Sequence, residues 1–129
     1  MVADLPWVSR TDMEPDHCYL AMASHLPLKT LSSTPRFLRA VSAVRRQLAV
    51  SEGLIGYTLR AKPLACDYWT LSVWKDEAAL RTFMQSPPHV QLMGSLQPLM
   101  GQTQFVQWEV TAGEGRPTWT TAMERLAAG

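Results

Sequence analysis

The chain has 129 residues, of which 47% are hydrophobic and 18% are charged. This length is sufficient for one domain with a buried core, and the composition is typical of a folded protein rather than a disordered one. The formal net charge of +1 provides no electrostatic field that would hold nucleic acid or an anionic membrane. We therefore expect neither of these among its partners.

The first ten residues contain no basic segment followed by an apolar one, so we expect no signal peptide. No apolar run approaches the roughly 20 residues of a membrane span, and a cytoplasmic location is the expectation. Cys18 and Cys66 are isolated in the sequence, which in such a compartment predicts free thiols. The three histidines do not have the spacing of metal ligands within one element, and we expect no metal site.

Residues 1–16 have scattered prolines and charges, which predicts an irregular extension in which Trp7 packs against the domain. The first strand is expected over residues 17–26, where the side chains alternate between two faces. One face carries Tyr19, Ala21, Ala23 and His25, and the other carries Leu20, Met22, Ser24 and Leu26.

A helix is expected from about residue 34 to residue 50, because Ser33 or Thr34 can cap it and Pro35 suits its first turn. Apolar residues recur along one face of it, at Phe37, Val41, Val44 and Leu48. The remaining polar positions, Arg36, Arg39, Arg46 and Gln47, are expected to face water.

Two further strands are expected at residues 54–62, where Gly56 indicates a bulge or a close backbone approach, and at residues 68–74. Asp76 is a good N-cap for the helix that follows. Ser86-Pro87-Pro88 ends that helix, and a second one is expected to carry His89 and Met93. A fourth strand at residues 103–110 and a short C-terminal helix complete the chain.

The order β-α-β-β-α-β predicts an α+β, ferredoxin-like domain over residues 17–112. Residues 1–16 form an N-terminal extension in this interpretation, and residues 113–129 form a helical C-terminal one. The first, third and fourth strands carry large apolar groups on both faces. Because a soluble monomer does not leave a broad apolar sheet exposed, we expect a homodimer with two sheets packed face to face.

Residues 68–93 combine a strand that ends in Trp74, an acidic helix start, a helix that contains Phe83 and a Ser-Pro-x-His-like break before His89. This combination resembles the antibiotic-biosynthesis-monooxygenase superfamily, across roughly residues 17–110. The resemblance implies a dimeric α+β barrel with a small-molecule cavity between sheet and helices in each subunit. Well-known members oxidise polyaromatic phenols without flavin or metal, or degrade haem, and related folds include isomerases, dehydratases and lyases.

The resemblance also relates individual positions. His25 falls where the haem-degrading members place a cavity Asn, and Trp74 matches their strand-terminal Trp. Their cavity Trp aligns with Phe83 and their iron-ligating His with Met93, two departures that count against haem degradation. Thr70 replaces the Asn by which the phenol-oxidising members stabilise an oxyanion. Haem held by His89 or Met93 stays the alternative to a cofactor-free enzyme.

The candidate catalytic residues are His25 and His89, because an imidazole can take or give a proton near neutral pH. Ala21 and Ala23 lie on the same predicted face as His25 and leave space for a cavity there. The candidate substrate-binding residues are Tyr19, Tyr68, Thr70, Trp74, Phe83 and Met93.

The function predicted from these features is that of a cofactor-independent monooxygenase acting on an apolar or aromatic secondary metabolite. The alternatives are a haem-binding or haem-degrading protein and a non-catalytic ligand-binding dimer. A lyase, isomerase or dehydratase on the same fold is a further alternative, because a fold does not determine a reaction.

Overall fold

The computed structural model describes residues 2–128, which form a mixed structure of strands and helices. In chain order the elements are β1 (Ala3–Asp4), β2 (Val8–Ser9), β3 (Cys18–Pro27), α1 (Thr34–Leu48), β4 (Leu54–Lys62), β5 (Asp67–Trp74), α2 (Glu77–Gln85), α3 (His89–Leu96), β6 (Gln104–Thr111) and α4 (Trp119–Ala128). None of the helices in this part of the chain is long and apolar enough to cross a membrane.

The strands form one six-stranded sheet in the order β1-β4-β5-β3-β6, with β2 also paired to β4. All pairings are antiparallel. The four long strands therefore have the arrangement β4-β5-β3-β6 of a ferredoxin-like subunit, in which each of the two helical connections passes over one intervening strand. The predicted α+β, ferredoxin-like fold is confirmed.

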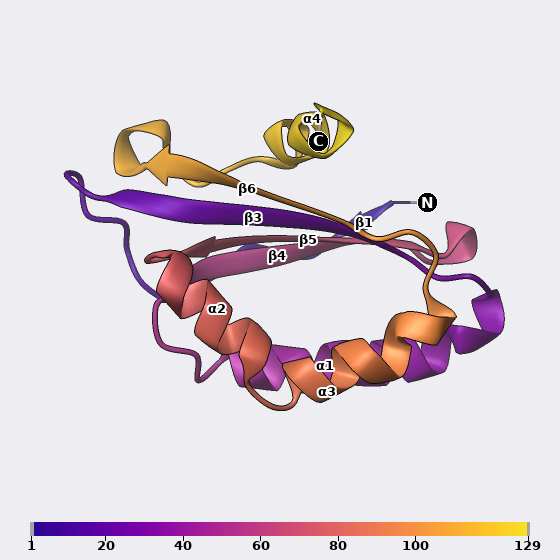
Figure 1. Ribbon diagram of the computed structural model, residues 1–129. Helices are drawn as coiled ribbons and strands as arrows, with labels where there is room; N and C mark the ends of the chain where they lie inside the picture. The colour runs from indigo at the N-terminus through magenta and orange to yellow at the C-terminus, as the bar shows by residue number, and fades with distance from the viewer. Residues whose placement is uncertain (1, 129) are drawn as a thin grey trace.

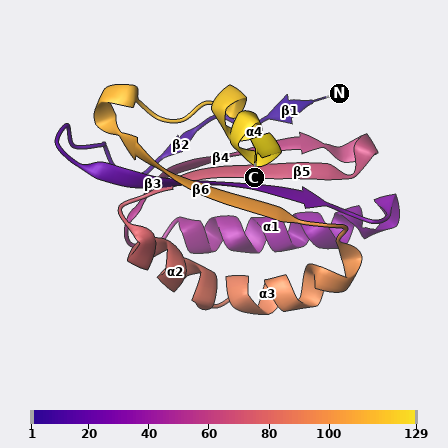
Figure 2. The ribbon, with the colours of Figure 1, turned by 45° about the horizontal axis from the view of Figure 1, so that its top comes forward.

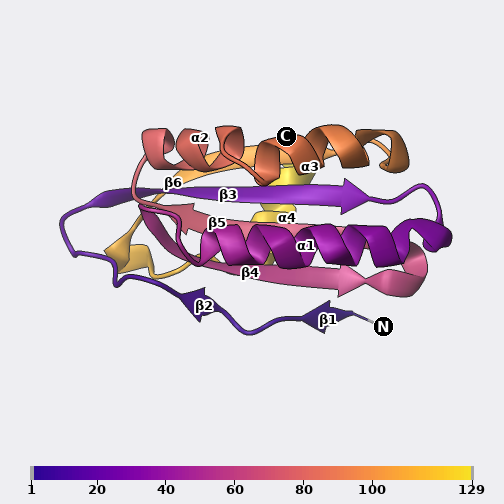
Figure 3. The same cartoon turned by 90° about the horizontal axis from the view of Figure 1, so that it is seen from below.

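The N-terminal segment is more regular than its sequence indicates. Ala3 and Asp4 pair with Ala61 and Arg60, and the β2 residues pair with β4 further along. These contacts use backbone groups, and the Thr58 hydroxyl additionally donates to the Leu5 carbonyl. Side-chain periodicity therefore could not reveal them. β1 and β2 lie along the outside of β4 (Figure 3), so that β6 is the opposite edge of the sheet.

The sheet is covered on both faces. Helices α1, α2 and α3 lie on one face and α4 lies on the other (Figure 1), over the middle of the strands (Figure 2). The core under α4 contains Tyr19, Ala21, Ala23, Trp69, Leu71, Val73, Trp108, Val110, Ala122 and Leu126. Two further clusters lie under the other helices, one around Trp74 and Phe83 and one around Phe37 and Tyr68.

The space beside the alanines of β3 is filled by other side chains and is not a cavity. Ala21 and Ala23 are fully buried in the same cluster as Ala122 of α4. Small side chains on both elements allow a helix to lie close to a sheet. The expectation that these alanines leave room for a ligand is therefore wrong, because α4 occupies that side of the sheet.

The C-terminal helix also removes the reason for which the sequence predicted a dimer. α4 buries the apolar face that would otherwise need a second sheet, and its Arg125 lies 5.4 Å from the ring of Trp108. Arg60 of β4 lies 4.9 Å from the ring of Trp119. Cations over indole rings add to the apolar packing at this face. A single subunit thus covers both faces of its own sheet.

Gly56 lies both at an irregularity of the strand and at a close approach to its backbone, the two features that a glycine within a strand indicates. The register of β4 on β5 shifts between Leu54 and Gly56, and a Cβ on Gly56 would lie 2.5 Å from the indole nitrogen of Trp7. Trp7 therefore packs directly on the glycine backbone. This close approach fixes the N-terminal segment against β4.

Candidate functional site

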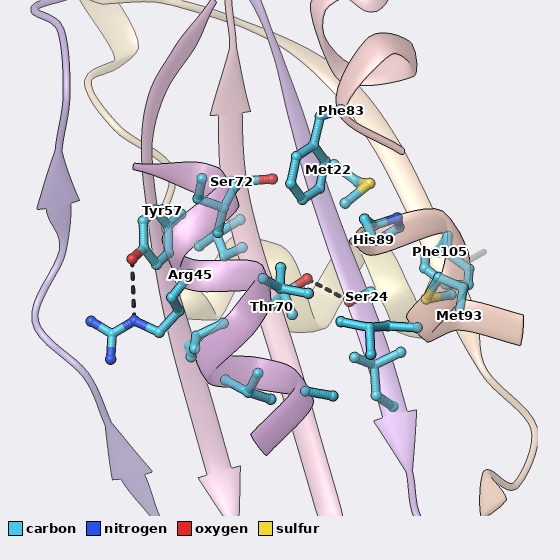
Figure 4. A pocket seen from close by; sticks show the side chains of 18 of the residues that line it. Met22, Ser24, Arg45, Tyr57, Thr70, Ser72, Phe83, His89, Met93 and Phe105 are labelled. Carbon is cyan, nitrogen blue, oxygen red and sulfur yellow. Dashed lines mark hydrogen bonds between the residues drawn. The ribbon is translucent and has the colours of Figure 1, made fainter. Parts of the chain in front are cut away.

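A cavity of about 120 Å³ lies between the sheet and the three helices α1, α2 and α3. Its walls are mostly apolar and come from every one of these elements. Aliphatic and aromatic groups that line it include Met22, Val44, Leu59, Phe83, Leu92 and Met93. Phe105 of β6 also lines the cavity and is 47% exposed, which shows that the cavity reaches the surface beside β6. Figure 4 shows this pocket from close by.

Hydroxyl groups on the strands give the floor of the pocket its polarity. Ser24 of β3 and Thr70 of β5 are cross-strand neighbours and share a short hydrogen bond (Figure 4). The pair has two O–H groups, and only one of them is used in that bond. Ser72 lies two residues along β5 and accepts a hydrogen bond of 2.9 Å from the indole N–H of Trp74. The floor can therefore donate hydrogen bonds to an oxygen atom of a bound molecule.

His89 is the titratable group of the helical wall. Its Nδ1 lies 3.1 Å from the carbonyl oxygen of Met84. Because a carbonyl only accepts, Nδ1 carries the proton and Nε2 has a free lone pair in the neutral ring. Burial lowers the pKa of His89, and the bond to Met84 opposes this to a smaller extent. The ring packs on Phe83, with centroids 4.7 Å apart. At neutral pH it is an uncharged base.

The backbone break between α2 and α3 places His89 at the pocket. Asp76 caps α2, accepting a hydrogen bond of 2.8 Å from the Ala79 amide, as its sequence position predicts. The helix ends before Ser86, whose hydroxyl donates to the carbonyl of Thr82. α3 then begins at His89. Since the first N–H groups of a helix have no partner within it, the His89 amide needs an external acceptor.

That acceptor is Gln47 of α1. The Oε1 of Gln47 accepts a 3.0 Å hydrogen bond from the His89 amide, and its Nε2 donates to the carbonyls of Phe83, at 3.0 Å, and Ser86, at 3.4 Å. The expectation that Gln47 faces water is wrong, since it is only 9% exposed. The Phe83 and Ser86 carbonyls already accept the amides of Ser86 and Val90, so Gln47 gives each a second donor, whereas it supplies the His89 amide with its acceptor.

Five residues predicted from the sequence come together at this pocket. Thr70 and Trp74 come from β5, Phe83 from α2, and His89 and Met93 from α3. Trp74 is fully buried, and its ring lies 5.1 Å from that of Phe83. The strand that ends in Trp74 and the broken helix therefore form one site, although the chain separates them by a turn.

His25 and Tyr19 do not reach the pocket, because they belong to the opposite face of β3. His25 stacks on Trp69 at 5.0 Å, and its Nε2 lies 2.9 Å from the Asp67 carboxylate. The Tyr19 hydroxyl accepts a 2.7 Å hydrogen bond from the Glu14 amide, beside the core under α4. Since alternate residues of a strand point to opposite faces, Met22, Ser24 and Leu26 face the pocket instead.

Tyr68 lies on the helical side of the sheet but beyond the end of the pocket. It packs on Phe37 at a ring distance of 4.4 Å, within the cluster that also contains Leu28 and Met100. Its hydroxyl is buried, with no hydrogen-bond partner among the residues that the structure describes. Phe37 separates Tyr68 from the lining, to which Phe37 itself contributes.

Sequence reasoning missed Ser24, Arg45 and Ser72 as pocket residues. For Ser72 a signal existed, because it shares its strand face with Thr70 and Trp74. The sequence placed Ser24 on the correct face of β3, but it predicted the cavity on the opposite face. No local signal distinguishes Arg45 from the other arginines of α1. In the part of the chain from residue 2 to residue 128, no three His, Cys, Asp or Glu side chains gather as a metal site would need.

Comparison with family models matches residues 39–128 to a domain of unknown function, DUF3291. The match begins within α1 and covers the pocket walls from there through β6, and also α4, whereas the lining residues of β3 precede it. The chain belongs to the DUF3291 family. No curated protein matches its sequence.

Solved structures place this DUF3291 chain among antibiotic-biosynthesis-monooxygenase folds, as its sequence resemblance predicts. SnoaB, a cofactor-independent oxygenase from Streptomyces nogalater, is 16% identical with a TM-score of 0.58, over 70% of this chain and 90% of its own. A putative antibiotic biosynthesis monooxygenase from Nitrosomonas europaea is 13% identical with a TM-score of 0.61, over 71% and 88%. A dimeric ferredoxin-like protein of unknown function from Thermobifida fusca is 14% identical with a TM-score of 0.63, over 78% and 99%. At these identities the likeness establishes the fold.

The lowered pKa of His89 predicts how the stability of this DUF3291 domain depends on pH. The unfolded chain protonates this histidine at about pH 6.5, whereas the folded protein resists protonation to lower pH. The free energy of unfolding should therefore fall as the pH decreases below 6.5, by at most about 1.4 kcal/mol per pH unit from this group. Chemical denaturation of the wild type and of His89→Gln between pH 8 and pH 5 should give a smaller decrease for the variant. Equal decreases in both proteins would contradict the burial of a neutral ring.

Gln47→Leu should destabilise the protein by about 1–3 kcal/mol, because it leaves the part-buried His89 amide without its acceptor and takes the second donor from the Phe83 and Ser86 carbonyls. Gln85→Leu, at an exposed position of α2, is the matched control and should change stability by less than about 0.5 kcal/mol. Urea denaturation measures both. Amide hydrogen exchange at His89 should become faster in Gln47→Leu alone, and unchanged exchange would show that Gln47 does not hold the start of α3.

Proposed function

We propose that this protein binds a small aromatic molecule in the pocket and oxygenates it with dioxygen, without a resident cofactor. The observation that carries the proposal is a neutral, half-buried His89 with a free Nε2 at the wall of an apolar chamber. An uncharged base in such a chamber can accept a proton from a substrate carbon or hydroxyl group. SnoaB, which has the same fold, is described as a cofactor-independent oxygenase, and this supports the proposal.

The dimensions of the pocket favour a compact ligand. A cavity of about 150 Å³ lined by apolar groups holds benzene in a well-studied case, and the present one measures about 120 Å³. One aromatic ring therefore fills the enclosed part. A larger molecule would extend past Phe105, where the pocket reaches the surface.

The chemistry requires a substrate with an acidic C–H or O–H bond. The Nε2 of His89 takes this proton, and the electron-rich anion that results can reduce dioxygen. For an activated methylene carbon of the ring, one atom of dioxygen becomes the oxygen of a carbonyl group on that carbon. The other atom leaves as water, together with the two protons of the methylene group. The free hydroxyl of the Ser24–Thr70 pair is available to stabilise negative charge on the substrate oxygen.

Haem does not fit this pocket. A cavity of about 120 Å³ is below the roughly 300–1,000 Å³ that ligand pockets for larger molecules occupy.

Oxygen uptake with one-ring and two-ring phenols and aryl ketones tests the proposed reaction. His89→Gln should lower kcat by about 10²–10⁴-fold and leave binding nearly unchanged, because it removes the base and keeps the pocket shape. The matched control is His25→Gln, on the other face of the sheet, which should retain activity within a few-fold.

Binding of a ligand by calorimetry without any oxygen uptake would refute the oxygenase and leave a ligand-binding protein. Equal losses in the two histidine variants would refute the assignment of His89. If no aromatic ligand binds at millimolar concentration, the proposal for the pocket fails altogether.

We further propose that the protein is a homodimer. β6 lies at the edge of the sheet, and Phe105 on that strand is 47% exposed. An open strand edge with an apolar side chain readily pairs with another chain. The relative from Thermobifida fusca is described as dimeric, which supports the proposal.

Light scattering at micromolar concentration should therefore give a mass of twice the 14.4 kDa of one chain. Gln107→Pro, which introduces a residue that disfavours strand pairing on β6, should shift the mass toward that of one chain if the β6 edge is the interface. A wild-type mass of one chain would contradict the dimer.

A further inference from the structure

The electrostatic character of the pocket is uneven, because one end carries a cation. Among the described residues that line it, Arg45 alone has a permanent charge, and no Asp or Glu contributes to the lining. His89 is neutral, since burial lowers its pKa. A negative charge on a ligand would therefore meet one counter-ion and no repelling carboxylate, whereas a positive charge would meet only Arg45.

A neighbouring side chain holds Arg45 in place. Its Nε donates a 3.2 Å hydrogen bond to the hydroxyl of Tyr57, and its guanidinium carbon lies 5.9 Å from the centre of the Tyr57 ring. Tyr57 is buried in the cluster that contains Trp74 and Phe83. Arg45 thus comes from the last turn of α1 with its stem on the pocket wall and its head supported by a fixed ring.

The terminal nitrogens of Arg45 lie at the outer rim of the pocket, where Figure 4 shows the guanidinium turned away from the other lining residues. Within residues 2–128, Arg45 forms no salt bridge, and the only hydrogen bond of its side chain uses Nε. The contrast with Arg60 and Arg81 is clear, because each of those is paired with a carboxylate at 2.6 Å. A guanidinium fork with free N–H groups fits a carboxylate in a two-point contact.

The two polar ends of the pocket lie on opposite sides. Figure 4 shows Arg45 and Tyr57 on one side of the lining residues, and His89, Met93 and Phe105 on the other. Arg45 is exposed, so a carboxylate bound there keeps part of its hydration and its transfer costs little. The apolar groups between the two ends would hold the ring.

We propose that the ligand of this pocket is a small aromatic acid, whose carboxylate binds Arg45 and whose ring points toward His89. The inference rests on the proposed ligand-binding function and names the class of molecule. Arg45 sets the specificity and the orientation of the ligand, so that the ring atoms next to His89 are those farthest from the carboxylate.

The ligands for the test are three phenyl-substituted acids of increasing chain length and, for each, the amide of the same shape. Benzoate, phenylacetate and 3-phenylpropanoate differ in the distance between ring and carboxylate, and their amides remove only the charge. Calorimetry with the wild type should show one acid of the series that binds about 3–10-fold more tightly than its amide at low salt, as expected for an exposed charge-assisted contact. The difference should decrease at 0.5 M salt, where exposed charges are screened.

The protein variants are Arg45→Met, Arg45→Lys and Arg46→Met. Arg45→Met should abolish the preference for the acid, and Arg45→Lys should restore part of it. Arg46 is exposed on the same helix turn and does not line the pocket, so Arg46→Met should keep the preference. Amide binding within about two-fold of wild type would show that the Arg45→Met pocket is intact.

The outcomes separate this inference from the proposed function. Amides that bind the wild type as tightly as the acids would overturn the role of Arg45 and leave the pocket as an aromatic site. Equal losses in Arg45→Met and Arg46→Met would also overturn it, because the effect would then come from the general charge of α1. Absence of binding by acids and amides alike would refute the ligand-binding function itself.

Discussion

The alternation of side chains along β3 and β5 is the constraint on which the rest of the structure depends. These are central strands with partners on both sides, so each of their residues must point either to α4 or to the three-helix layer. Ala21 and Ala23 allow α4 to lie close to one face, while Ser24, Thr70 and Ser72 face the pocket on the other. A shift by one residue would exchange these two sets.

The helical layer forms the pocket because it is interrupted at its centre. A continuous helix across residues 77–96 would bring a different set of side chains to the sheet, whereas the break before His89 turns α3 and brings its first residue to the wall. The break leaves the His89 amide without an acceptor in its own helix. Gln47 of α1 accepts from this amide and also donates to the Phe83 and Ser86 carbonyls. One buried amide thus connects the packing of the helices with the position of the base.

The polar groups of the pocket are few, and each has a defined environment. The hydroxyl pair lies on the sheet, the neutral imidazole lies on the helical wall, and the guanidinium lies at the exposed rim. In an apolar chamber, electrostatic interactions are stronger than in water. A small number of groups can therefore determine both the orientation of a ligand and the site at which it reacts.

The sequence alone determined the order of the main elements and the ferredoxin-like class. It also determined the cap at Asp76, the break before His89 and the position of Thr70 and Trp74 on the same face of one strand. These features depend on local periodicity and on short-range backbone preferences. The tertiary structure decided the rest: that α4 covers one face of the sheet, that His25 lies outside the pocket, that Gln47 is buried and that Arg45 reaches the lining. Strand alternation indicates which residues share a face, but not which face a distant helix will cover. That choice depends on how well whole surfaces fit together, and no segment of the sequence contains it by itself.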